Sequence, residues 1–524
     1  MRKGMLLATL FLIVVASCAG PAKTPTPTLA PTIPPSPPTP TPTPKAGPVR
    51  GGTLIVAISA NPDGLDPHKT VAAVTFEVAK SLYDTLVESD PQGNIVPGLA
   101  EKWESSPDGL RWTFHLRKGV KFHNGREMTS KDVKASFERI LNPETKAPRA
   151  KDYAVIQSIE TPDDYTIIFQ LKEPQAAFLS NLAYGWAAIV PVEEKDLRNH
   201  PVGTGPFRFV EWVPDSHVKL ERFPDYFLKD QPYLDAVIFK IMPDPASKLA
   251  ALKAGEVDVV DQVPPQEVGK LKENPEIKLI QAPANGIYIM ALNNAREPFN
   301  KKEVRQAISY AVDKKGVIEA AQWGQGTPIG SHMPPVTPFY VDLTDKYPYN
   351  PEKARQLLAQ AGYPEGFEVT LIMPQPYDFH IRNCEVIADY LKKIGIKPKL
   401  ETYEWGMWLD RVYMGRDYQA TCIGHTGRLD PDPFLNRYVS DSKENYMNYN
   451  NPHYDEIIRQ AAVTSDFQKR KELYAEAQRI LAEDAVALYL MAPLWTVGVR
   501  KGVEGWQIYP IDIFDLRTVY KKSS

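Results

Sequence analysis

The chain has 524 residues, of which 43% are hydrophobic and 24% are charged, and its formal net charge is -3. This ordinary composition is enough for two or three globular domains with sizeable cores. The mild acidity argues against a general affinity for nucleic acid or for anionic lipid.

The first 48 residues predict export and a membrane anchor. Arg2 and Lys3 precede the apolar run MLLATLFLIVVAS (5–17), which has the length of a signal-peptide core and is short for a membrane span. The sequence VASC that ends at Cys18 resembles a bacterial lipobox, which implies cleavage before Cys18 and acylation of its thiol. Residues 18–48 are rich in Pro and Thr and favour an extended polyproline II tether, about 80 Å long. The alternative is a secreted protein with a disordered stalk.

From residue 49 onward, predicted strands alternate with predicted helices. In the first half we expect strands at 49–58, 165–171, 237–241 and 257–260, and helices at 75–88, 129–141 and 246–254. Thr129 is a plausible N-cap with Asp132 in the first turn, and Gly255 stands at a C-cap position.

The second half continues the alternation. Helices are expected at 301–312, 351–361, 379–394, 405–414 and 467–483, and strands at 367–373, 399–403, 419–424 and 487–490. The alternation predicts a layered α/β architecture.

Five blocks follow one another in a specific order. They are GGTLIVAISANPDGLDPHKT (51–70), the stretch 82–141, VGTGPFRFVEW (202–212), ALKAGEVDVV (251–260), and VRQAISYAVDKKGV (304–317) with YNPEKARQLLAQAGYP (349–364) after it. Together they resemble the solute-binding proteins of ATP-binding-cassette importers, in the peptide, opine and nickel class.

That resemblance implies an α/β, two-lobed periplasmic-binding-protein fold of type II, with a hinge and an extra small domain. By analogy, lobe I combines residues 49–81, 190–285 and 492–524, the small domain is 82–189, and lobe II is 286–491. The hinge is expected at 284–286 and 491–493. Ligand is buried between the lobes when they close.

The segment GHTGRLDPDPFL (424–435) matches a strand-end loop of that family. Binders of free peptides usually carry an aspartate where this chain has Arg428, and it pairs with the ammonium group of the peptide. Arg428 cannot do this, and His425 replaces the usual Trp. An Arg fork suits a carboxylate, a phosphate or sugar hydroxyls. Alternatively, Arg428 forms a salt bridge with Asp430 or Asp432 and staples the loop.

The other candidates for ligand contact are spread over both lobes and the small domain. Trp405 matches the position of a pocket Trp in peptide-binding relatives, or else is a core residue. Tyr184 and Trp186 face the ligand or cover the small domain. The remaining candidates are Val74, Thr75 and Phe76, which follow the first strand of lobe I. The polar stretch 445–451 suits a cleft edge, although a solvated loop is favoured.

The other possible chemistries have little support. Cys384 and Cys422 could pair in an exported protein or remain thiols. With His380 and His425 they could form a Cys₂His₂ zinc set, but strand alternation opposes it, so no metal is expected. The segment GTGPF (203–207) lacks the ending of a phosphate-binding loop, and no hydrolase motif is present.

These features predict a lipid-anchored, monomeric substrate-binding subunit on the outer face of the cytoplasmic membrane, without catalytic activity or cofactor. It would deliver a peptide-like, opine or oligosaccharide solute to a permease with its ATPase subunits. The alternatives are a conventional oligopeptide binder, and a sensor or chaperone without a transport role on the same fold.

Overall fold

The computed structural model describes residues 47–194, 196–375 and 378–522. The signal peptide, Cys18 and nearly all of the Pro/Thr-rich tether lie outside these residues. Over the described ranges, no helix combines the length and the apolar character that crossing a membrane requires.

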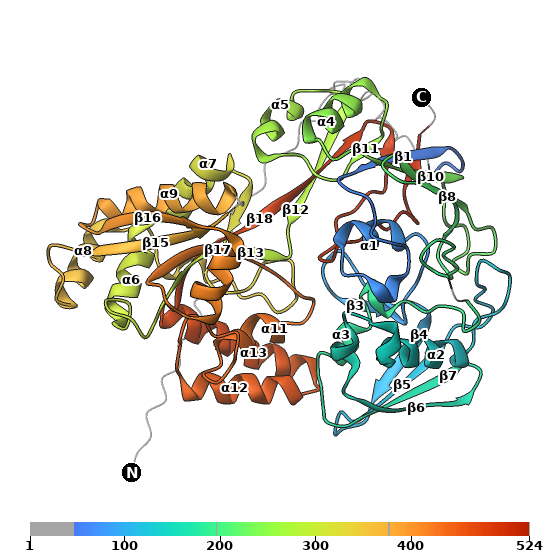
Figure 1. Ribbon diagram of the computed structural model, residues 1–524, viewed down its shortest axis with the longest axis horizontal. Coiled ribbons are helices and arrows are strands. Elements are labelled where there is room, and N and C mark those ends of the chain that lie inside the picture. The colour runs from blue at the N-terminus through green and yellow to red at the C-terminus, as the bar shows by residue number, and fades with distance from the viewer. Residues whose placement is uncertain (1–46, 195, 376–377, 523–524) are drawn as a thin grey trace, which may run out of the picture. The chain divides into compact units, whose positions relative to one another are not determined.

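One mixed sheet dominates the described part of the chain and contains twelve strands (Figure 1). Its order is β16 (Lys397–Tyr403), β15 (Glu368–Pro374), β17 (Ala420–Thr426), β13 (Gly286–Leu292), β18 (Ala487–Arg500), β11 (Val259–Val260), β1 (Thr53–Ile58), β10 (Ala236–Ile241), β9 (His217–Arg222) and β8 (Phe207–Val213). Strands β12 (Ile277–Pro283) and β14 (Gly326–Pro328) also pair with β18.

A separate four-stranded antiparallel sheet has the order β4 (Ala100–Ser105), β5 (Arg111–Leu116), β7 (Thr166–Leu171) and β6 (Ile156–Asp163). Two short ribbons pair β2 (Val87–Ser89) with β3 (Ile95–Pro97), and β19 (Val503–Glu504) with β20 (Tyr520–Lys521). The helices with α-helical geometry are α1 (Ala73–Ala79), α2 (Ser130–Leu141), α3 (Phe178–Asn181), α4 (Pro245–Ala254), α5 (Val268–Lys272), α6 (Lys302–Ala311), α7 (Lys314–Gln322), α8 (Pro351–Gln360), α9 (Asp378–Lys392), α10 (Trp405–Trp408), α11 (Asp432–Leu435), α12 (Pro452–Val463) and α13 (Phe467–Glu483).

Strand β18 joins the two ends of the large sheet. Its first residues pair with β13, from Ala291↔Ala487 to Tyr288↔Met491, and its later residues pair with β12, from Pro283↔Leu494 to Ile277↔Arg500. Figure 1 shows β18 and β12 running side by side between the two halves of the picture. The predicted strand 487–490 was therefore too short, because β18 continues past Pro493, whose carbonyl accepts the N–H of Ala284 at 2.8 Å.

The sheet around β13 is covered on both faces. Successive residues of β13 alternate between two apolar clusters, since Ile289 belongs to one and Met290 to the other. The first cluster is completed by α12 and α13, and the second by α6, α7, α8 and α9. Burial of both faces explains why strands in this part of the chain have apolar residues at consecutive positions.

Most predicted helices are confirmed with shifts of one or two residues at their ends. Thr129 and Asp132 form a reciprocal capping box at the start of α2, and Gly255 caps α4 with a φ of 81°. The helix expected at 75–88 is wrong beyond Ala79. Instead, the backbone of residues 81–82 accepts hydrogen bonds from Gly205 and Phe207, and a Cβ on Gly203 would lie 2.1 Å from the carbonyl oxygen of Leu82. The glycines of the GTGPF segment therefore permit close backbone contact.

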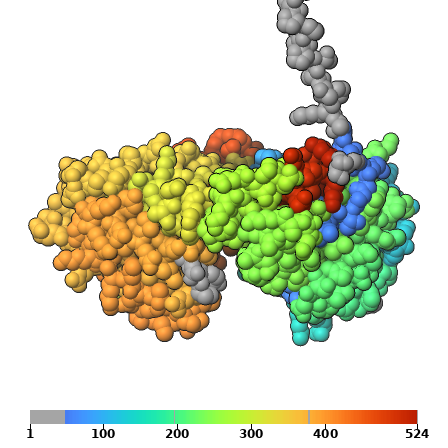
Figure 2. Space-filling view, turned by 90° about the horizontal axis from the view of Figure 1, so that it is seen from above, coloured from blue at the N-terminus to red at the C-terminus, as the bar shows by residue number. Residues whose placement is uncertain are grey.

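The C-terminal segment lies against the first strand. Figure 2 shows it in red beside the blue first strand and the green segment that contains α4 and α5. Lys521 pairs with Asp258 at 2.9 Å, and the buried Arg517 pairs with Glu88 at 2.6 Å. These ion pairs fix the end of the chain to residues that are far away in sequence.

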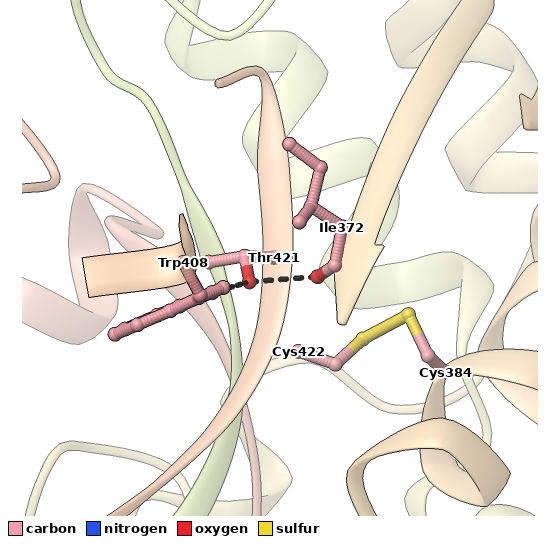
Figure 3. Close-up of a disulfide and its surroundings, with 5 residues drawn as sticks. All are labelled: Ile372, Cys384, Trp408, Thr421 and Cys422. Carbon is pink, nitrogen blue, oxygen red and sulfur yellow. Dashed lines mark hydrogen bonds between the residues drawn. A yellow bond between two sulfur atoms is a disulfide. The ribbon is translucent and has the colours of Figure 1, made fainter. Parts of the chain in front are cut away.

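A disulfide between Cys384 and Cys422 joins α9 to β17, with the two Cα atoms 5.8 Å apart (Figure 3). On the opposite face of β17, the indole N–H of Trp408 donates to Thr421 at 3.0 Å, and the Thr421 hydroxyl donates to the carbonyl of Ile372 at 2.7 Å. The two cysteines are therefore paired, and neither is available as a thiolate ligand for the alternative zinc site. Strand β17 is thus held from both faces.

We predict that the Cys384→Ser/Cys422→Ser double variant unfolds with a free energy lower than that of the wild type by about 2–4 kcal/mol, because the cross-link closes a loop in the unfolded chain. Urea unfolding of the two proteins measures this difference. Reduced wild type should match the variant, and equal stability of oxidised wild type and variant would contradict the prediction.

Candidate functional site

Strand β17 delivers the 424–435 segment to the end of the sheet. Gly427, the first residue after the strand, donates its N–H to the carbonyl of Asn285 at 2.7 Å. A Cβ at Gly427 would lie 2.1 Å from Asn285 Oδ1 and 2.5 Å from the ring of Phe434, so a larger residue would displace the loop. This close approach fixes where the next residue, Arg428, leaves the strand.

The guanidinium of Arg428 lies against two stacked aromatic rings. Its Cζ atom is 5.5 Å from the ring centroid of Tyr184 and 5.2 Å from that of Trp186. The two rings are parallel with centroids 4.3 Å apart, and the Tyr184 hydroxyl accepts the N–H of Leu429 at 2.7 Å. Burial raises the pKa of Tyr184 to about 12, so the phenol is neutral at physiological pH. The structure therefore brings Arg428 and Tyr184 together, although they are far apart in sequence.

Arg428 does not staple its own loop. Asp430 forms a buried pair with Arg470, with distances of 2.6 and 2.7 Å to the two guanidinium nitrogens. Asp432 accepts a hydrogen bond from Tyr474 at 3.4 Å. Among the described residues, no carboxylate lies within 4.0 Å of the Arg428 guanidinium, and so the salt bridge considered from sequence is not formed.

His425 takes part in a row of buried polar rings inside the second half of the chain. Tyr446 lies 3.0 Å from His425 Nε2, and His425 Nδ1 lies 3.3 Å from His332 Nε2. The other nitrogen of His332 contacts the hydroxyl of Tyr438. Burial is the main reason that the pKa values of His425 and His332 fall well below the usual range, so both imidazoles are neutral. Both ring nitrogens of His425 are thus engaged within the protein.

The stretch 445–451 is mostly not a solvated loop. Asn445, Tyr446 and Met447 are buried, and Tyr446 is part of the row of rings around His425. The predicted solvated loop is wrong because polar side chains of this stretch form hydrogen bonds inside the protein. Asn445, for example, donates to the carbonyls of Val439 and Tyr449.

The other sequence candidates are placed as follows. The Thr75 hydroxyl donates to Asp63 at 2.8 Å, and Val74 is half-buried against the core. Phe76 packs edge-on to Trp186, with ring centroids 5.6 Å apart, and lines a pocket together with Tyr83, Gly185 and Ile513. Trp405 stacks on Trp408 at 5.3 Å in a different cluster. Phe76, Tyr184 and Arg428 therefore surround one indole, whereas Trp405 and His425 belong to other groups.

The sequence did not indicate Arg149, which lies near this indole, or the acidic residues Glu77 and Asp512. Arg149 places its Cζ atom 4.8 Å from the Trp186 ring centroid. Burial raises the pKa of Glu77 to about 8, and it also raises the pKa of Asp512, which the charge of Arg428 opposes. Glu77 is 6% exposed, and its Oε2 has no hydrogen-bond partner in the described structure. No motif marks these residues, although Glu77 directly follows the three candidate positions 74–76.

Metal ligation finds no geometric support in the part of the chain described. Over residues 47–194, 196–375 and 378–522, no group of three His, Cys, Asp or Glu side chains is arranged to hold an ion. What the arrangement around Trp186 offers instead is stacking surface together with two guanidinium groups. Such a surface can bind a polar solute without reacting with it.

Comparisons with known proteins agree with this fold. The family model for bacterial extracellular solute-binding proteins, family 5, matches residues 94–446. The dipeptide-binding protein of Escherichia coli K12 is 32% identical over 504 residues, which cover 89% of this chain and 94% of that protein. The structure of HbpA2 from Haemophilus parasuis aligns with a TM-score of 0.84 and 30% identity, covering 90% of this chain and 100% of that one.

A further solved structure, AgaA in complex with agropinic acid from A. tumefacien R10, aligns with a TM-score of 0.68 and 33% identity, covering 90% of this chain and 99% of that one. The chain belongs to the family 5 extracellular solute-binding proteins. Its fold is the two-lobed α/β fold of type II periplasmic binding proteins, as the resemblance implied.

The raised pKa of Glu77 predicts a pH-dependent loss of stability in the ligand-free protein. Because the folded state keeps this proton up to about pH 8 while an unfolded glutamate loses it near 4.5, stability contributed by the neutral form is full below 4.5 and is lost as pH rises towards 8. Glu77→Gln should match the wild type at pH 4 and exceed its free energy of unfolding by about 1–3 kcal/mol at pH 8. Urea titrations at both pH values test this, and a constant difference between the two proteins would count against it.

Proposed function

We propose that this chain is the substrate-binding subunit of an ATP-binding-cassette importer, and that it captures a polar solute with an anionic group between its lobes and delivers it to a permease. The observation that carries the proposal is Arg428, whose guanidinium lies on the aromatic pair of Tyr184 and Trp186 with no carboxylate within 4.0 Å among described residues. A cation held on aromatic rings and left without an anion is suited to an incoming carboxylate.

The names of the relatives include binders of acidic solutes among several chemical classes. AgaA was solved with agropinic acid, and other relatives are named as dipeptide-, glutathione- and heme-binding proteins. Arg428 stands where peptide binders of the family carry an aspartate, so we favour an opine-like or otherwise acidic solute over a free peptide held by its ammonium end.

Capture requires two lobes that move as units. We propose lobe I at 49–81, 190–285 and 492–524, the small domain at 82–189, lobe II at 286–491, and a hinge at 284–286 and 491–493. The change of partner along β18 and the bond from Ala284 to Pro493 support this hinge. Ligand contacts that exist only in the closed state would shift the population towards closure, and no covalent step is involved.

We further propose that the mature chain begins at an acylated Cys18 and works as a monomer on the outer face of the cytoplasmic membrane. The lipobox-like VASC sequence and the Pro/Thr-rich tether support this placement. Cys18→Ser should move the full-length chain from the detergent phase to the aqueous phase in Triton X-114 partition of expressing bacteria. Unchanged partition, with the wild-type protein as control, would exclude lipid attachment at this residue.

The solute can be identified by native mass spectrometry of residues 49–524, followed by ejection and fragmentation of the bound mass. We expect a solute with at least one carboxylate or phosphate, and Arg428→Asp should weaken its binding roughly 100-fold or more, because the new charge repels it. Arg459→Gln, which changes an exposed arginine of the same lobe, is the matched control. Equal occupancy in Arg428→Asp and wild type would refute the proposed anchor, and a neutral peptide as the bound mass would restore the oligopeptide alternative.

A further inference from the structure

We propose that Arg149, in the segment between α2 and β6, forms with Arg428 a two-guanidinium clamp for one carboxylate or other oxyanion group of the solute. This inference rests on the proposed function and makes it more specific. It assigns the second arm of the anion site to a residue outside lobe II, so that a single anionic group contacts both sides of the cleft.

Both guanidinium groups lie close to the indole of Trp186. Arg149 Cζ is 4.8 Å and Arg428 Cζ is 5.2 Å from the ring centroid of Trp186. The two residues approach this indole from segments separated by almost 280 positions in the sequence. Both side chains are half-buried, so each keeps a part of its surface open to a small molecule.

Neither cation is paired with a carboxylate, whereas three other buried or half-buried arginines of this protein are. Arg139 pairs with Asp66, Arg470 pairs with Asp430, and Arg517 pairs with Glu88 and Asp515. In the described ranges, by contrast, neither Arg149 nor Arg428 has a carboxylate within 4.0 Å, and the buried Nε of Arg149 has no hydrogen-bond partner. A buried N–H of a charged group that makes no hydrogen bond is unfavourable, and an oxyanion would satisfy it.

The two positive charges also act on each other. Burial lowers the pKa of Arg149, and the positive charge of Arg428 lowers it further. Asp512 interacts electrostatically with Arg428, but it forms no ion pair with either arginine in the described structure. An oxyanion between the two guanidiniums would remove their repulsion and accept hydrogen bonds from both.

This placement couples the anion to closure of the lobes. Arg428 is carried by the loop after β17, whereas Arg149 and Trp186 belong to the segment that contains the four-stranded sheet. The bond from Leu429 to Tyr184 shows that these two segments are in contact in this structure. The anion can contact both arginines only when the two segments are close together. The anionic group of the solute would therefore also stabilise the closed state.

Succinate, a small dicarboxylate, is the probe for the clamp. Binding to ligand-free protein, refolded from guanidinium chloride, is measured by tryptophan fluorescence at constant ionic strength. We expect saturable binding to the wild type and at least tenfold weaker binding to Arg149→Gln and to Arg428→Gln. The double variant should bind no more weakly than either single variant, since both arms hold one group. Arg149→Lys, which keeps the charge and loses the planar fork, should be intermediate, and Arg459→Gln should bind as the wild type does.

The outcomes separate this inference from the proposed function. If Arg149→Gln binds like the wild type while Arg428→Gln does not, Arg428 remains the anchor and the clamp is refuted. If the wild type shows no saturable binding, or neither substitution changes it, the clamp and the anionic anchor both fail. Thermal unfolding of ligand-free Arg149→Gln provides a second readout. The clamp predicts an unchanged or higher midpoint because repulsion is relieved, and a marked decrease would assign Arg149 a purely structural role.

Discussion

The pairing of β18 with two successive partners is the constraint on which the rest of the structure depends. One strand of fourteen residues is bonded to β13 in its first part and to β12 in its second. The two ends of the large sheet are therefore connected through backbone hydrogen bonds as well as through the chain. Strand β17, which leads to Arg428, is positioned relative to β18 through its pairing with β13, and the C-terminal segment follows β18 directly.

The candidate site is built from strongly fixed residues around a few unsatisfied ones. The disulfide and the Trp408–Thr421 bond hold β17 from both faces, and the buried pair of Arg470 with Asp430 holds the loop after Arg428. Such support keeps a polar surface organised in the absence of ligand, which lowers the entropic cost of binding. Arg149, by contrast, contacts the indole of Trp186 while its buried Nε has no hydrogen-bond partner in the described structure.

Local rules predicted most of the elements, because capping residues, glycines and apolar spacing act over a few positions. The capped start of α2 at Thr129 and the end of α4 at Gly255 are of this kind. The helix expected at 75–88 failed because Gly205 and Phe207, far away in sequence, donate hydrogen bonds to residues 81–82, and Gly203 packs closely against Leu82. For the same reason the sequence indicated Arg428 and Tyr184 but not Arg149, since nothing near Arg149 in the chain shows that it meets Trp186. The roles of all these residues in binding stay predictions.

Formation of the disulfide between Cys384 and Cys422 also depends on the compartment in which the protein folds. Cytosolic reductants keep thiols reduced, so a newly made chain acquires this cross-link only after it reaches an oxidising compartment. In protein produced in a reducing cytoplasm, β17 would still pair with its neighbouring strands but would lack the covalent bond to α9. Preparations of mixed redox state would then contain two populations that differ in the rigidity of the strand leading to Arg428, and their apparent affinities would depend on how the protein was made.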